Sequence, residues 1–116
     1  MLRAGPDNGS YPPSMDEILS KLQQWFAQQC DGDWEHDCGI RIETLDNPGW
    51  IIKINLAGTE LEGRSFSPIA HGLDHEASTD WHSLSVKGDT FEAAGDPTKL
   101  TFMLQTFLNW ARRAGG

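Results

Sequence analysis

The sequence predicts an α+β domain in which an antiparallel sheet of about four strands is packed on one face by an N-terminal and a C-terminal helix. Apolar residues recur with helical spacing near both ends of the chain and alternate with period two in the segments between them. These alternating segments come in two pairs, each joined by a short turn. A short turn cannot hold a parallel crossover, so each pair is expected to form an antiparallel hairpin.

The first helix is expected to begin at Ser14, after a flexible N-terminal segment over residues 1–13 that is rich in Gly, Pro, Asn and Ser. Ser14 and Glu17 have the spacing of a capping box. The helix is expected to end near Cys30 to Gly32, and residues 14–114 are expected to form one domain. Its apolar face is formed by Met15, Ile18, Leu19, Leu22, Trp25 and Phe26.

The first hairpin is predicted over residues 38–56. Cys38, Ile40 and Ile42 alternate with charged residues, and the turn residues 46–49 follow. The returning strand places Trp50, Ile52, Ile54 and Leu56 on one face.

The second hairpin is predicted from Trp81–Lys87 and Thr90–Ala94, joined at Gly88-Asp89. Residues 57–79 contain several Gly and a Pro between the two hairpins. We expect irregular structure there, or one weak edge strand near Leu61 to Phe66.

The C-terminal helix is expected to start with Asp96 as its N-cap and Pro97 as its first residue. It is expected to run to Arg112 and Arg113, which suit the negative end of the helix dipole. Trp110 lies about 60° from the centre of the apolar stripe, so partial exposure is expected. The stripe consists of Leu100, Met103, Leu104, Phe107, Leu108 and Ala111.

The chain of 116 residues has 17 acidic residues against 9 Lys and Arg, giving a formal charge of −8. Phosphate binding needs a basic patch, so this charge argues against a direct nucleic-acid binder and favours a basic protein partner. No run of about 20 apolar residues and no apolar signal-peptide region is present. We therefore expect a cytoplasmic protein that does not bind membranes.

The densest set of possible metal ligands lies between the two cysteines, Cys30 and Cys38. A calcium loop begun at Asp31 needs glycine where His36 stands and glutamate where Ile42 stands. Zinc could use the cysteines with His36, but the second ligand pair of a structural site is missing, and His71 with His75 is a weak alternative. We expect two thiols rather than a disulfide in a reducing compartment, with no metal and no cofactor.

Catalytic motifs are equally scarce. The acidic neighbours of both cysteines disfavour a thiolate nucleophile, and the serine-hydrolase, P-loop and dinucleotide motifs are absent. Glu35 and His36 beside Trp34 are the best candidates for acid/base chemistry. A small acid/base or metal-dependent enzyme using Glu35 and His36 is therefore one alternative, and a generic protein-interaction module is another.

A specific resemblance is carried by Trp34-Glu35-His36 and by the block from Thr44 to Trp50. Because these motifs and the further residues given below follow one another in the same order as in that family, the chain resembles the immunity protein 53 family over roughly residues 18–113. The resemblance implies a non-enzymatic bacterial immunity protein of a polymorphic toxin system, which binds its toxin and needs no cofactor. Further residues of the pattern are Trp25, Cys30, Gly32, Gly39, Ile40, Asp80, Trp81, Phe91, Gly95, Asp96, Pro97, Phe107 and Trp110.

We expect the partner to be a basic toxin domain that meets an acidic, Trp-containing surface near one end of the sheet. Trp34 is either a lid over the core or an anchor in this interface. The protein itself is expected to be a monomer or a weak homodimer. The candidate partner-binding residues are Asp31, Asp33, Trp34, Glu35, His36, Asp37 and Asp46.

Overall fold

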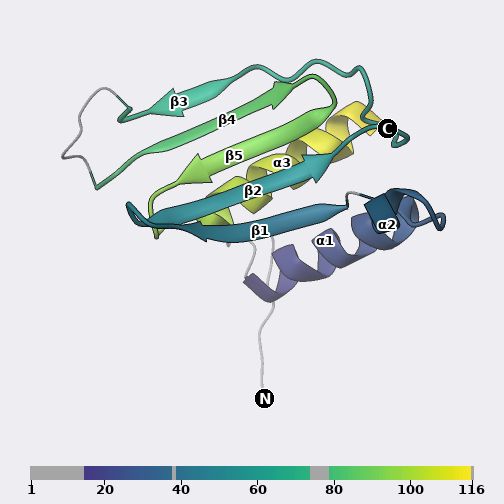
Figure 1. The fold of residues 1–116 in the computed structure, drawn as a ribbon, viewed down its shortest axis with the longest axis horizontal. Coiled ribbons are helices and arrows are strands. Elements are labelled where there is room, and N and C mark those ends of the chain that lie inside the picture. Colours follow the sequence, from purple (N-terminus) through teal and green to yellow (C-terminus); the bar gives the residue numbers. More distant parts are fainter. Residues whose placement is uncertain (1–14, 38, 74–78, 116) are drawn as a thin grey trace, which may run out of the picture.

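The computed structural model describes residues 15–37, 39–73 and 79–115. Its five strands form one antiparallel sheet in the order β1-β2-β5-β4-β3. Helices α1 and α3 both lie on one face of the sheet, and no helix among the described residues covers the other face (Figure 1). The elements are α1 (Met15–Gln29), α2 (Trp34–Asp37), β1 (Ile40–Leu45), β2 (Gly49–Asn55), β3 (Ile69–His71), β4 (His82–Lys87), β5 (Thr90–Gly95) and α3 (Leu100–Gly115).

The predicted α+β class, both hairpins and both long helices are confirmed, with one strand more than expected. The N-terminal segment 1–13 and the predicted cap at Ser14 lie outside the described residues. Among the helices that the structure describes, none is both long and apolar enough to cross a membrane.

The core lies between the helices and the central strands. Ile52 and Ile54 of β2 and Phe91 of β5 are fully buried, which confirms the predicted inward face of β2. On β1 the same alternation leaves Ile42 39% exposed, because β1 is an edge strand of the described sheet and pairs with β2 alone. Period two therefore predicts which face a side chain takes, while the position of a strand in the sheet decides how deeply it is buried.

Residues 56–68 form an irregular segment, and the edge strand lies further along the chain than expected. Leu61 is fully buried but sits in a turn, not a strand. The hydroxyl of Thr59 donates to the carbonyl of Leu56 at 2.7 Å and accepts from the N–H of Leu61 at 3.1 Å. Because such local bonds satisfy the backbone, this segment needs no strand partner, and pairing with β4 begins only at Ile69.

The buried tryptophans hold the irregular segments against the core. The indole N–H of Trp110 donates to the carbonyl of Ser65 at 2.7 Å, and that of Trp25 donates to Glu60 at 2.8 Å. Trp110 is only 5% exposed, so the expectation of partial exposure was wrong. The reason is that the 56–68 segment crosses α3 and packs Phe66 on the Trp110 ring, with centroids 5.2 Å apart.

Asp96 joins β4, β5 and the start of α3. Its carboxylate is 1% exposed and accepts bonds from the N–H of Trp81 at 2.9 Å, the N–H of Thr98 at 2.7 Å and the ammonium of Lys99 at 2.6 Å. The sequence predicts that α3 starts directly after Asp96, but the helix starts later in the structure. A turn closed by a bond from the Lys99 N–H to the Asp96 carbonyl precedes it. The carbonyl of Lys99 then accepts from Met103, and α3 begins at Leu100.

Replacing Asp96 should destabilise the fold strongly. Asp96→Ala leaves the Lys99 ammonium and the Trp81 N–H without their buried acceptor, and we expect the free energy of unfolding in urea to fall by about 3–5 kcal/mol. The exposed Asp33 serves as control, since Asp33→Ala should change this free energy by less than about 0.5 kcal/mol. Equal effects of the two substitutions would contradict the assigned role of Asp96.

Candidate partner-binding site

The acidic run after α1 folds into a tight turn that caps α2. The carboxylate of Asp31 accepts from the N–H groups of Asp33 at 2.9 Å and Trp34 at 3.0 Å. The carboxylate of Glu35 reaches back to the N–H groups of Asp31 at 2.9 Å and Gly32 at 2.7 Å. These four bonds satisfy the N–H groups of residues 31–34, which lead into α2. We call residues 31–37 the acidic turn.

Both carboxylates of this network remain charged at neutral pH. Hydrogen bonds from the N–H groups of Trp34 and Asp33 lower the pKa of Asp31. Bonds from its own backbone N–H and from those of Asp31 and Gly32 lower the pKa of Glu35. A general acid or base that works near pH 7 needs the opposite shift in a carboxyl group, so this setting does not favour Glu35 as a catalytic acid.

Trp34 lies in the core beneath the acidic turn. It is 6% exposed, its ring meets that of Trp25 edge-on with centroids 5.7 Å apart, and its indole N–H donates to the carbonyl of Asn55 at 2.9 Å. Of the two sequence alternatives, the structure therefore places Trp34 as a lid over the core. It fixes the acidic turn to the end of β2 and is not an exposed anchor.

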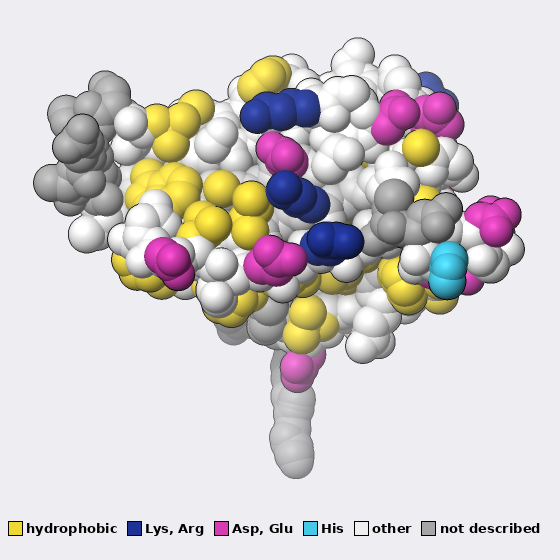
Figure 2. All heavy atoms as spheres, in the orientation of Figure 1, with side chains coloured by type: hydrophobic (Ala, Val, Ile, Leu, Met, Phe, Trp, Pro, Cys, Tyr) yellow, Lys and Arg dark blue, Asp and Glu magenta, His cyan; other side chains and the backbone are white. Residues whose placement is uncertain are grey.

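The structure brings only part of the predicted surface together. Asp31, Asp33, Glu35 and His36 are exposed in one turn at the end of the sheet where β1 begins. Figure 2 shows acidic side chains and a histidine at this end of the molecule. Asp46 lies in the turn at the other end of β1, a strand of six residues, which is about 20 Å away at the rise of an extended chain.

The side chains of Asp33 and His36 make no hydrogen bond or ion pair with the residues that the structure describes, which leaves both available to a partner. The backbone of Asp37 ends α2, and its side chain lies outside the description. Cys30 is a free, exposed thiol whose Sγ donates to the carbonyl of Phe26 at 3.3 Å. Desolvation and the charges of Glu35 and Asp31 raise its pKa, which is unfavourable for a nucleophile.

The metal alternatives gain no support from the described residues, among which no three His, Cys, Asp or Glu side chains are grouped closely enough to hold an ion. Cys38 and His75, which two of these alternatives require, lie outside the description.

A second polar cluster, not anticipated from the sequence, joins β3, β4 and α3. The Nε2 of His71 lies 3.3 Å from a carboxylate oxygen of Asp80, whose other oxygen accepts from the Lys99 ammonium at 2.6 Å. The rings of His71 and His82 stack with centroids 5.3 Å apart. The register of β3 on β4 places these histidines side by side, and this pairing has no signature in the sequence.

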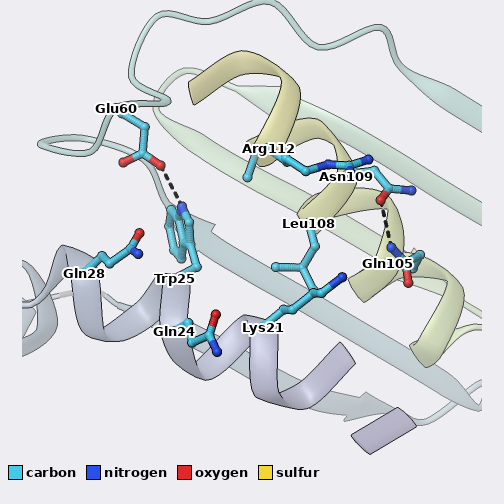
Figure 3. Close-up of a pocket in the computed structure, with 10 residues that line it drawn as sticks. Lys21, Gln24, Trp25, Gln28, Glu60, Gln105, Leu108, Asn109 and Arg112 are labelled. Atoms are coloured by element: carbon cyan, nitrogen blue, oxygen red, sulfur yellow. Dashed lines mark hydrogen bonds between the residues drawn. The ribbon is translucent and has the colours of Figure 1, made fainter. Parts of the chain in front are cut away.

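A groove of about 890 Å³ lies between α1, α3 and the 56–68 segment (Figure 3). Trp25 and Leu108 contribute its apolar part, and Lys21 and Arg112 are its cations. Besides the two cations, the lining carries the carboxylate of Glu60 and four side-chain amides, so the groove suits the binding of polar groups. The remaining lining residues are Gln24, Gln28, Glu60, Gln105, Asn109 and Ala111.

Protonation of His82 should make the fold less stable in mild acid. Burial, followed by the nearby charges of His71 and Lys99, lowers the pKa of His82 below its ordinary value of about 6.5. The unfolded chain therefore binds more protons around pH 6 than the folded chain, and stability is lost as pH falls from 7.5 to 5.5. Urea unfolding at these two pH values should show a smaller loss for His82→Phe than for the wild type. The variant His36→Gln, which alters an exposed histidine of the acidic turn, should behave as the wild type.

Comparison with known families agrees with the resemblance seen in the sequence. A family model described as immunity protein 53 matches residues 19–112, a range that begins in α1 and ends in α3 and contains the whole sheet. Neither a curated protein nor a solved structure gave a match. Because the match covers most of the chain, the protein belongs to the immunity protein 53 family.

Proposed function

We propose that this protein is a non-enzymatic immunity protein of a polymorphic toxin system, which binds a cognate bacterial toxin in the cytoplasm and neutralises it. The observation that carries the proposal is the family match over residues 19–112. The formal charge of −8 supports a basic toxin domain as the partner, because opposite charge accelerates the encounter of two proteins.

The acidic turn is the surface that we assign to the toxin. Its charges are held by four backbone hydrogen bonds, so little conformational freedom is lost when a partner binds. Asp33 and His36 are the exposed residues free to contact the partner, Asp37 ends the same turn, and Asp46 would take part only in an interface that extends along β1. Trp34 supports this surface from below.

The enzyme alternative has a weaker physical basis. Glu35 would have to give up its bonds to two backbone amides to act on a substrate, and its lowered pKa makes it a poor proton donor at neutral pH. A role in fixing the turn explains the same contacts with no further assumption.

The first experiment is co-expression of this protein with the product of the adjacent gene, scored by cell survival and by co-purification. Rescue of growth together with a stable complex is expected. Absence of both rescue and complex would overturn the proposed function.

The contribution of the acidic turn is tested by charge reversal in that complex. Asp33→Lys should slow association by roughly threefold to tenfold at low salt, and the difference should shrink as salt is added. Asp89→Lys reverses an exposed acid in the turn between β4 and β5 and is the matched control. If both variants associate like the wild type at every salt concentration, the acidic turn does not steer the toxin.

A further inference from the structure

The outer edge of β1 carries backbone groups that no strand pairs among the residues that the structure describes. The N–H of Asn55 donates to the carbonyl of Gly39 at 3.1 Å, so Gly39 and Asn55 are a hydrogen-bonded pair of the antiparallel ladder between β1 and β2. Hydrogen-bonded pairs alternate along such a ladder, so the backbone groups of Arg41, Glu43 and Leu45 also bond to β2. The N–H and C=O groups of Ile40, Ile42 and Thr44 therefore point away from the sheet.

The side chains of these three edge residues face the helices, because Ile40 and Ile42 lie opposite the buried Ile54 and Ile52. Helix α1 runs along β1 on that side and extends past the edge of the sheet (Figure 1). On α1, Leu19 is 39% and Phe26 is 37% exposed, and both lie on one side of the helix at a spacing of two turns. A Cβ built on Gly39, the residue before β1, would lie 3.9 Å from the Phe26 ring, so Phe26 lies beside the start of the strand. Together with the exposed Ile42 of β1, we call Leu19 and Phe26 the apolar strip. Figure 2 shows hydrophobic side chains along the lower edge of the molecule.

The charge around this edge is mainly acidic. The acidic turn lies where β1 begins, Asp46 lies where it ends, and Glu43 lies between them, while Arg41 is the one base on the strand. A segment that fits the edge must therefore be extended, apolar on the side that faces α1, and basic elsewhere.

We propose that an extended, basic segment of the toxin pairs with β1 as a sixth strand of the sheet. Ile40, Ile42 and Thr44 offer it three N–H donors and three C=O acceptors. Its residues opposite these three point toward α1 and cover Leu19, Phe26 and Ile42. The inference rests on the proposed function and deepens it, because it joins Asp46 and the acidic turn into one continuous interface along β1.

A second copy of the chain fits this edge less well. A two-fold axis beside β1 would place the α1 helices of both copies on the same side of a continuous sheet. Because α1 extends past β1, the two helices would compete for one space (Figure 1). An extended segment has no such helix and can lie on α1.

Amide hydrogen exchange tests the pairing directly. In the free protein the amides of Ile42 and Thr44 should exchange fast, while those of Arg41 and Glu43, bonded to β2, should exchange slowly. In the complex with the product of the adjacent gene, the Ile42 and Thr44 amides should slow by about 100-fold or more.

Variants test the same edge through affinity. Ile42→Pro removes an outward N–H without removing a bond to β2, and edge strands accept proline at such positions. Leu19→Glu places a charge on the apolar strip. Both should weaken binding of the adjacent gene product by at least about tenfold, whereas Leu73→Glu should bind like the wild type. Leu73 is the matched control, since it is an apolar residue with 54% exposure that follows β3 at the other edge of the sheet.

The outcomes separate this inference from the proposed function. A complex in which the Ile42 and Thr44 amides exchange as in the free protein and Leu19→Glu binds normally would overturn the pairing with β1 and leave the immunity function standing. Protection of these amides in a homodimer without toxin would also overturn it. Failure of the wild type to bind the adjacent gene product would overturn both.

Discussion

The fold depends on one buried carboxylate. Asp96 directly follows β5, and its oxygens accept bonds from the N–H of Trp81 just before β4, from the turn before α3 and from Lys99. A carboxylate at 1% exposure would be strongly destabilising without these donors. Burial by itself raises the pKa of Asp96, but the bonds from Lys99 and Thr98 outweigh it and hold the pKa far below its ordinary value. The charge is thus kept in the interior, where it fixes the position at which α3 leaves the sheet.

From that point the aromatic residues extend the core to the loops. Phe107 of α3 packs on Phe91 of β5 and on Trp25 of α1, with ring centroids 5.0 Å apart in both pairs. Trp25 in turn meets Trp34 under the acidic turn. Four of the five tryptophans hold loops against the core: the indole N–H groups of Trp25, Trp34, Trp50 and Trp110 each donate to a segment distant in sequence.

The sequence predicts the elements well because hydrophobic periodicity and turn residues are local signals. Both hairpins and the apolar faces of both long helices follow from them. The burial of Trp110 does not follow from local signals, because the residues that cover it belong to the 56–68 segment, and Ser65 lies 45 residues away in the sequence. The same holds for the proposed partner surface: Asp31, Asp33 and Glu35 are neighbours in the chain and lie in one turn, whereas Asp46 is separated from them by the length of β1. The sequence also contains a signal for the role of Glu35 in the turn, because acidic residues close to each other before and within a short helix commonly bond to its first backbone amides.

The exposed polar residues of the acidic turn are of two kinds, which differ in their freedom to change. Asp31 and Glu35 hold the backbone of the turn, so a substitution there alters its shape as well as its charge. Asp33 and His36 hold nothing among the described residues and can vary at little cost to folding. Divergence among members of the immunity protein 53 family is therefore expected to concentrate at these two positions, with the framework of the turn retained, so that the exposed surface changes on an unchanged scaffold.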